Sequence, residues 1–306
     1  MMNETHFSQF CFIQAVANSS ENKMHILKIP VTGSGPDRYM YGIAERDRFG
    51  RRYVLLAPFG LYASPGWNKT LATETVRKIV KTITGYPVAR FNWNVRFDHQ
   101  SLAESLISFG FKYEQQTTHI LDLSPGYERI FSNFTATVRN QIRKSMRKGV
   151  RIERVYDEAS VRAYHAIYIK LVEEQKRGWS YPVELFLELA KETASTFFLM
   201  AIAQSKIIGG GIFFYDGCSM RYWHGAADRT YSNLFPTCLL IDYAIRQSCE
   251  AEKSFFGFGG SAGKASLEQF KSYWGTERKQ YWEFRWQHPL WAFASSWKRK
   301  LLKVTH

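Results

Sequence analysis

Hydrophobic and polar positions along the second half of the chain predict a regular series of helices and strands. A helix begins after Ser124-Pro125 and ends at Gly149, and the order that follows is strand, two helices, three strands, helix, strand, helix, strand. These elements are predicted at 150–155, 159–176, 183–192, 196–203, 207–215, 220–225, 234–250, 254–258, 265–274 and 280–286. Tight turns join the three consecutive strands, which predicts an antiparallel sheet at this point.

The first half of the chain ends in the same order of elements. Its predicted helices and strands lie at 5–17, 24–31, 38–45, 51–57, 69–84, 88–95, 101–109 and 112–123. A gapless alignment of the two halves at an offset of 165 residues matches Phe91 with Phe256 and Gly110 with Gly275. We interpret this agreement as a duplication. The predicted fold class is therefore α+β with a mixed sheet, in tandem domains at 1–123 and 124–286, followed by a tail at 287–306.

Composition narrows the classes of partner. The chain has 306 residues with 41 Lys and Arg against 27 Asp and Glu, a net charge of +14. This charge predicts attraction to a polyanion, which includes RNA, an anionic membrane surface and phosphorylated small molecules. Hydrophobic residues make up 45% of the chain, which argues against disorder.

The four cysteines are scattered and show no metal-ligand spacing, so we expect a reduced cytoplasmic protein with no metal site. No apolar run approaches the roughly 18 residues that a membrane span needs. The tail combines four aromatic residues with a basic end, which suits the inner membrane surface, RNA or a packed last helix. The aromatic residues are Trp286, at the end of the last predicted strand, and Trp291, Phe293 and Trp297. The basic end is Lys298-Arg299-Lys300.

The predicted helix at 265–274 carries the first candidate for catalysis. Leu267, Phe270 and Trp274 fall on one helical face, and Lys271 follows Phe270 at the edge of that face. An ammonium beside an aromatic wall suits a developing oxyanion. The alternative is a surface lysine whose stem covers the core.

A second candidate is the basic side of the predicted helix that ends at Gly149. Phe134, Val138 and Ile142 form its apolar face, and Arg139 and Arg143 lie on a neighbouring face. Like charges four residues apart repel each other, so a polyanion bound along this face would explain the pattern. A solvated basic face is the alternative.

Further candidates follow the predicted helix at 159–176 and lie on the strand at 220–225. Arg177 suits a phosphate clamp, although a cation there also complements the helix dipole. Tyr222 and His224 alternate on the strand, so we expect them on one face and Trp223 on the other. His224 is a candidate general base or a hydrogen-bonded core residue. Other candidates for the base are Asp228, Asp242, Glu268 and the substrates themselves.

These patterns together resemble a known family. The element order is similar to the GCN5-related N-acetyltransferase (GNAT) fold, and its doubling in one chain resembles the FemABX-like aminoacyltransferases. The motifs that carry the resemblance are Arg139-x-x-x-Arg143-Lys144 with Lys148-Gly149-Val150, Tyr222-x-His224-Gly225-Ala226, Phe256-Gly257-Phe258-Gly259 and Phe270-Lys271-x-x-Trp274-Gly275. The best-known members transfer an amino acid from aminoacyl-tRNA to the stem peptide of a peptidoglycan precursor.

The resemblance implies two tandem GNAT-like domains packed around a central cleft. The resemblance places Lys271, the residue after Phe270, at the reaction centre, where its ammonium stabilises the tetrahedral intermediate of acyl transfer. It also implies that Arg177, Tyr181 and Tyr222 contact the acceptor. The chain lacks the long coiled-coil insertion that some members carry.

The donor is inferred from a missing motif. Acetyltransferases of this fold cradle the coenzyme A pyrophosphate on a glycine-containing loop before the central helix. The matching stretch here, 229–236, has no glycine. We therefore expect aminoacyl-tRNA as the donor, a cell-envelope precursor as the acceptor and no cofactor. The alternatives are an N-acetyltransferase that uses acetyl-CoA or another acyl-CoA on an amino sugar or similar amine, and a non-catalytic RNA- or membrane-binding protein.

Overall fold

The computed structural model describes residues 9–19, 24–30, 39–46, 52–56, 77, 81, 91–95, 100–216, 218–261, 263–286 and 289. These residues fall into two compact units. Unit 1 contains the described residues from Thr117 to Lys279, and unit 2 contains those from Gln9 to Gln116 and from Gln280 onward. Strands β5 (Lys112–Asp122) and β11 (Glu277–Trp286) each belong partly to both units. The predicted domain boundaries after residues 123 and 286 fall at the ends of these strands and remain predictions.

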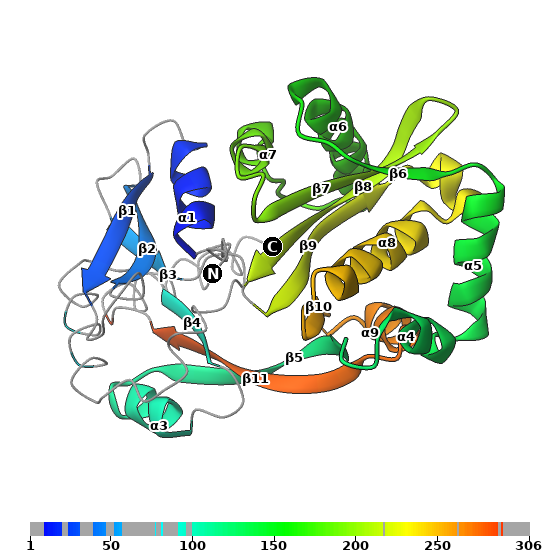
Figure 1. Cartoon of the computed structure of the whole chain (residues 1–306). Helices are drawn as coiled ribbons and strands as arrows, with labels where there is room; N and C mark the ends of the chain where they lie inside the picture. The colour runs from blue at the N-terminus through cyan, green and yellow to red at the C-terminus, as the bar shows by residue number, and fades with distance from the viewer. Residues whose placement is uncertain are drawn as a thin grey trace, which may run out of the picture. The chain divides into compact units, whose positions relative to one another are not determined.

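Unit 1 is built on a mixed sheet with the strand order β5-β10-β9-β8-β7-β6 (Figure 1). Its remaining strands are β6 (Arg151–Arg154), β7 (Thr196–Ala203), β8 (Lys206–Asp216), β9 (Ser219–Ala227) and β10 (Phe255–Gly260). Strand β10 runs parallel to β9, and the other neighbours are antiparallel. The predicted α+β class with a mixed sheet is confirmed.

Helices cover both faces of this sheet. Helices α6 (Glu158–Glu174) and α7 (Val183–Ala190) pack on one face, and α8 (Pro236–Glu250) packs on the other (Figure 1). Helices α4 (Tyr127–Asn133) and α5 (Ala136–Arg147) contact α8. Strand β7 has buried residues on both sides of the sheet, which explains its continuous apolar sequence.

The helix predicted from Ser124-Pro125 to Lys148 is wrong as a single element. The chain breaks at Phe134 and Thr135, which both have extended backbone conformations. The Thr135 hydroxyl accepts a hydrogen bond from Val138 N and so caps a new helix, α5. The predicted apolar face is nevertheless buried, because Phe134, Val138 and Ile142 all lie in the core.

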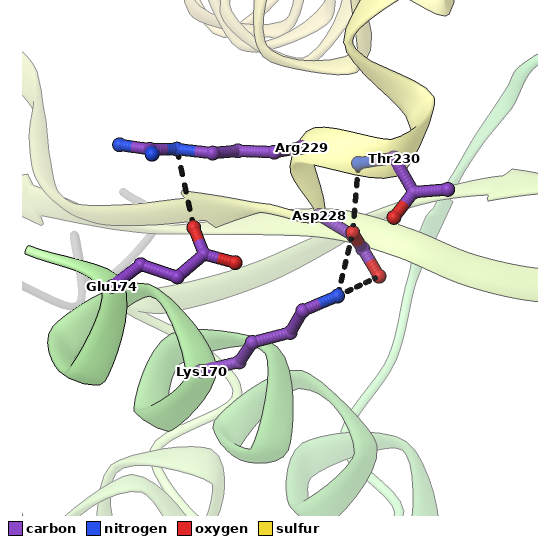
Figure 2. A network of polar contacts seen from close by, with 5 residues as sticks. All are labelled: Lys170, Glu174, Asp228, Arg229 and Thr230. Atoms are coloured by element: carbon purple, nitrogen blue, oxygen red, sulfur yellow. Dashed lines mark hydrogen bonds and ion pairs between the residues drawn. The ribbon is translucent and has the colours of Figure 1, made fainter.

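The stretch before α8, predicted as a loop, forms the 3₁₀ helix η4 (Arg229–Leu234), so α8 begins at Pro236 and not at residue 234. A polar network fixes the start of η4 (Figure 2). Asp228 accepts a hydrogen bond from Thr230 N at 2.9 Å and pairs with Lys170 of α6 at 3.1 Å. Arg229 pairs with Glu174, also on α6, at 3.2 Å. The network ties the end of β9 to the helix that covers it.

Unit 2 contains an antiparallel sheet of β1 (Met24–Pro30), β2 (Tyr39–Arg46) and β3 (Arg52–Leu56). Helix α1 (Gln9–Asn18) contacts β1 and β2 and buries Phe12 and Ile13. The predicted helix at 69–84 and the aromatic basic tail lie almost wholly outside the described residues.

The internal repeat predicted from the sequence has a structural counterpart. Helix α3 (Gln100–Ser108) and helix α9 (Ala265–Ser272) begin 165 residues apart, as do β5 and β11. Both Gly110 and Gly275 adopt positive φ angles, of 82° and 68°. These agreements support the duplication.

The strand pairings follow the same repeat. Phe256 of β10 pairs with Leu121 of β5, and Phe91 of β4 (Phe91–Val95) pairs with Trp286 of β11. The two pairs are related by the offset of 165 residues. The last strand of each repeat therefore pairs with the preceding strand of the other repeat.

Candidate functional site

Lys271 on α9 is buried, with 4% of its surface exposed. Its ammonium donates hydrogen bonds to the carbonyl oxygens of Gly259 and Gly260, each at 2.8 Å. Both carbonyls belong to the end of β10. An ammonium has three N–H groups, and the third has no hydrogen-bond partner among the described residues.

The backbone around these carbonyls is irregular. Strand β10 pairs with β9 only as far as Gly257 and Arg221, although both strands continue for several residues. The register of β10 against β5 shifts between Gly257 and Gly259, and Gly259 has a φ of 70°. A left-handed backbone is readily adopted by glycine, which explains the residue type at this bulge.

Burial lowers the pKa of Lys271 from 10.5 to about 8, and Glu268 acts in the opposite direction. The ammonium is thus the main form at neutral pH, but it loses its proton more readily than an exposed lysine does. A poorly solvated cation with an uncommitted N–H group suits the stabilisation of an oxyanion.

The predicted apolar face of α9 is only partly correct. Trp274 is fully buried and contacts Phe270 and Phe134. Leu267 is 36% exposed and so does not belong to the core. The helix ends at Ser272 and places Lys271, in the last turn, deeper than Phe270.

The prediction that Tyr222 and His224 share a face of β9 is wrong. The register between β8 and β9 shifts so that Ile212 pairs with His224 and Phe213 pairs with Tyr222. Trp223 is therefore the extra residue of a β-bulge, which breaks the alternation of side chains. Tyr222 stacks on Phe213 in the core beneath α8.

His224 lies instead in an aromatic cluster with α6 and α7. Its Nδ1 is 2.7 Å from the hydroxyl of Tyr164, and its ring contacts Tyr168 and Phe186. Burial lowers the pKa of His224 to about 3, and Arg177 and His165 add to this effect. The imidazole is neutral at pH 7, which makes it a weak base and a good hydrogen-bonding partner.

Tyr181 and Arg177 lie at the edge of this cluster. The Tyr181 ring contacts Trp223 and His224, and its backbone N–H donates to the hydroxyl of Tyr168 at 3.0 Å. Arg177 is exposed. Burial raises the pKa of Tyr181 and lowers the pKa of His224, and the positive charge of Arg177 has a smaller, lowering effect on both. The structure thus brings together Arg177, Tyr181 and His224.

Arg139 and Arg143 lie elsewhere, at the contact of α4 and α5. The guanidinium of Arg139 donates to the carbonyls of Ser132 and Phe134 and so satisfies the end of α4. Arg143 lies over the ring of Phe131 at 5.6 Å. Arg139 therefore has a structural task, whereas Arg143 keeps an exposed guanidinium.

Sequence reasoning missed two polar residues beside Lys271. His119 of β5 is buried, and its Nδ1 is 3.2 Å from the hydroxyl of Thr276. That hydroxyl donates to the carbonyl of Lys271 at 3.0 Å. His119 lies near Lys271 because it pairs with Gly259 across the sheet. No pattern in the sequence specifies that strand register.

Residues 132–272 match the family described as Acetyltransferase (GNAT) domain. This segment of the chain is therefore similar to GNAT acyltransferase domains. The matched segment contains Lys271, Tyr222, His224, Arg177 and both carbonyls that bind the Lys271 ammonium. No curated protein matches the sequence significantly.

Solved structures share the fold over nearly the whole chain at low sequence identity. The crystal structure of FemX is 12% identical with a TM-score of 0.70, covering 95% of this chain and 99% of that one. The C-terminal domain of a putative lysylphosphatidylglycerol synthetase from Agrobacterium fabrum is 11% identical with a TM-score of 0.60, covering 94% and 96%. A tandem GNAT protein from the clavulanic acid biosynthesis pathway is 10% identical with a TM-score of 0.53, covering 92% and 94%. The expected FemABX/GNAT-like fold is confirmed.

The family match also concerns the acyl donor. Enzymes with this domain use acyl-CoA as a co-substrate and not as a tightly bound cofactor, so an acyl-CoA donor is consistent with the family.

Within the part of the chain that the structure describes, no helix has the length and apolar content needed to span a bilayer.

Proposed function

We propose that the chain transfers an aminoacyl group from aminoacyl-tRNA to an amine of a cell-envelope precursor. The acceptor amine attacks the ester carbonyl, and the carbonyl oxygen becomes an oxyanion. Collapse of the intermediate breaks the ester C–O bond, and the leaving tRNA hydroxyl takes up the proton that the amine loses, so that the products are an amide and free tRNA. The remaining N–H group of Lys271 donates to the oxyanion. The observation that carries this proposal is the buried ammonium on two backbone carbonyls at the end of β10.

The acceptor is assigned to the side of the sheet that carries α6 and α7. Arg177 provides an exposed guanidinium for a phosphate or carboxylate, and Tyr181 and Trp223 provide aromatic surface next to it. Trp179, which contacts Tyr181, is 59% exposed and extends this surface. These features suit a large anionic acceptor such as a peptidoglycan precursor, bound by a cytoplasmic protein at the inner membrane surface.

The preference for a tRNA donor is supported by the charges of α5. Arg143, Lys144, Arg147 and Lys148 are exposed, and none of them pairs with a carboxylate of the described residues. The other described surface cations include several that do pair, such as Arg162 with Glu158. An uncompensated basic helix suits a phosphate backbone. The folds of FemX and of the lysylphosphatidylglycerol synthetase domain are consistent with this donor class.

The second candidate function is an N-acetyltransferase that uses acyl-CoA on an amino sugar or similar amine. The GNAT family match favours it. The start of α8 argues for the tRNA donor instead, because Pro236 at the first helical position has no N–H group to offer a pyrophosphate. The N–H groups of Tyr231 and Phe235 also bind backbone carbonyls within this turn.

The test is product identification by mass spectrometry. Purified protein is mixed with total charged tRNA or with acetyl-CoA, and with amine acceptors that include peptidoglycan precursors. We expect an aminoacyl amide with charged tRNA and no acetylated product. Acetylation without aminoacylation would favour the second candidate, and no product with either donor would contradict acyl transfer to these acceptors.

The role of Lys271 is tested with a matched pair of variants. Lys271→Met should lower turnover at least about 100-fold, as expected for the loss of one oxyanion donor. Lys264→Met removes an exposed lysine just before the same helix and should leave turnover unchanged. If Lys271→Met keeps the cellular activity and RNA affinity of the wild type, a non-catalytic binding protein is the better account.

A further inference from the structure

The protonation state of His119 follows from its hydrogen bonds. The Thr276 hydroxyl donates its single hydrogen to the carbonyl of Lys271, at 3.0 Å. Towards His119 Nδ1, at 3.2 Å, that hydroxyl therefore acts only as an acceptor. Nδ1 must carry a hydrogen, and in the neutral ring Nε2 is left with a free lone pair.

That lone pair is buried and has no hydrogen-bond partner among the described residues. His119 is 4% exposed, the same fraction as Lys271. A buried polar group without a partner destabilises the fold, and such groups are rare in folded proteins. His224 is different, because its Nδ1 is hydrogen-bonded to Tyr164.

The position of His119 relates it to the catalytic lysine in two ways. It pairs across the sheet with Gly259, whose carbonyl binds the Lys271 ammonium. It also reaches the backbone of Lys271 through Thr276. The hydroxyl of Ser261, next to Gly260, is likewise buried without a hydrogen-bond partner among the described residues. His119 and the carbonyl that holds the Lys271 ammonium are thus neighbours across the pairing of β5 with β10.

We propose that His119 Nε2 accepts the proton of the attacking amine. This inference rests on the proposed function. As the nitrogen forms its bond to the ester carbonyl, its proton passes to Nε2 while Lys271 holds the oxyanion. When the C–O bond breaks, the protonated imidazole returns that proton to the leaving ester oxygen. The product is an amide and a free hydroxyl, and His119 is neutral again.

The charges around His119 favour its neutral form. Lys271 and Glu268 face it from α9, and Arg278 faces it from β11. Burial and then Lys271 lower the pKa of the ring below its usual 6.5, and the opposing effect of Glu268 is smaller. A base that is neutral at pH 7 loses its function only when it is protonated. We therefore expect the fall in turnover at low pH, the acidic limb of the pH–rate profile, to report protonation of His119.

The experiment compares His119→Asn with Thr276→Val in the full chain. The asparagine amide occupies the place of Nδ1 and still donates to Thr276, but it offers no base at the place of Nε2. Turnover should fall about 100-fold, the acidic limb should disappear, and KM for the donor should stay within about twofold. Thr276→Val removes the bridge and keeps the imidazole, so the acidic limb should remain.

The outcomes separate this inference from the proposed function. A wild type without turnover on either donor overturns the proposed function, whereas an active wild type and a His119→Asn variant with the same acidic limb overturn the inference alone. If His119→Asn does not fold, nitrogen NMR of the ¹⁵N-histidine-labelled wild type decides. A proton on Nδ1 and a bare Nε2 at pH 7 support the inference, and a proton on Nε2 overturns it.

Discussion

The ammonium nitrogen of Lys271 lies 2.8 Å from the carbonyl oxygen of Gly259. The carbonyl oxygen of Gly260 binds the same nitrogen at the same distance. Both partners are backbone carbonyls and therefore carry no net charge. A buried ammonium held by carbonyls keeps its full charge, whereas a carboxylate partner would neutralise much of it. This arrangement explains how one side chain is both fixed in place and available to a developing negative charge.

Burial of this charge predicts a pH-dependent stability. The pKa of Lys271 is about 8 in the folded chain and near 10.5 when the side chain is solvated. Between these values the unfolded chain binds more protons than the folded chain, so the free energy of unfolding rises with pH. From pH 7.5 to pH 10 the gain should be about 2 kcal/mol relative to Lys271→Met. Urea unfolding of both proteins at the two pH values measures it, and parallel pH dependences would contradict the shift.

The close contact of Tyr222 with Gly225 predicts a steric effect. A Cβ on Gly225 would lie 1.7 Å from the Tyr222 hydroxyl, so Gly225→Ala should lower the free energy of unfolding by about 2 kcal/mol. Adding Tyr222→Phe removes the clashing oxygen and should recover part of the loss. Gly178→Ala is the control, because a Cβ there meets nothing within 4 Å. Equal urea midpoints for the two alanine variants would show that this contact is not formed.

Much of the fold was predictable from local patterns. The apolar run of β7 specified its bounds at Thr196 and Ala203, and the repeat offset agreed with the starts of α9 and β11. The break at Phe134 was missed because the hydrophobic periodicity continues across it. The cap by Thr135, the bonds from Arg139 and the hydrogen bond from Thr135 N to the Tyr273 carbonyl stabilise the interruption, and these depend on tertiary geometry.

Arg177 provides a prediction about the acceptor. Arg177→Ala should raise KM for an anionic acceptor about tenfold and leave kcat unchanged, because it removes a contact made equally in the ground state and the transition state. Arg162→Ala is the control, since Arg162 is exposed on α6, the helix that precedes Arg177, and pairs with Glu158. A fall in kcat at constant KM would place Arg177 in the chemical step instead.

The basic residues of α5, which pair with no carboxylate in the part of the chain that the structure describes, provide a prediction about RNA. Replacing Arg143, Lys144 and Arg147 by glutamine should weaken tRNA binding and reduce the slope of log affinity against log salt by about 3. A control variant with the same change in charge replaces Arg162, Lys191 and Lys279, each of which pairs with a carboxylate. Filter binding at several salt concentrations measures both. Equal slopes would show that α5 does not carry the RNA contact.

The candidate site was predictable only in part. The motif around Phe270 singled out Lys271, but nothing in the sequence shows that its ammonium binds two carbonyls of β10. The bulge at Trp223 turned His224 away from Tyr222, because one extra residue changes the face of every side chain that follows. His119 escaped notice because its importance depends on long-range strand register.

The most direct test of the central claim is the pH dependence of kcat in the wild type and in Lys271→Arg. The wild type should lose activity above about pH 8, as the ammonium loses its proton. Arginine stays protonated throughout this range, so the variant should show a lower rate that does not decline up to pH 9.5. An alkaline limb at the same pH in both proteins would contradict the assignment of Lys271 as the cation that holds the oxyanion.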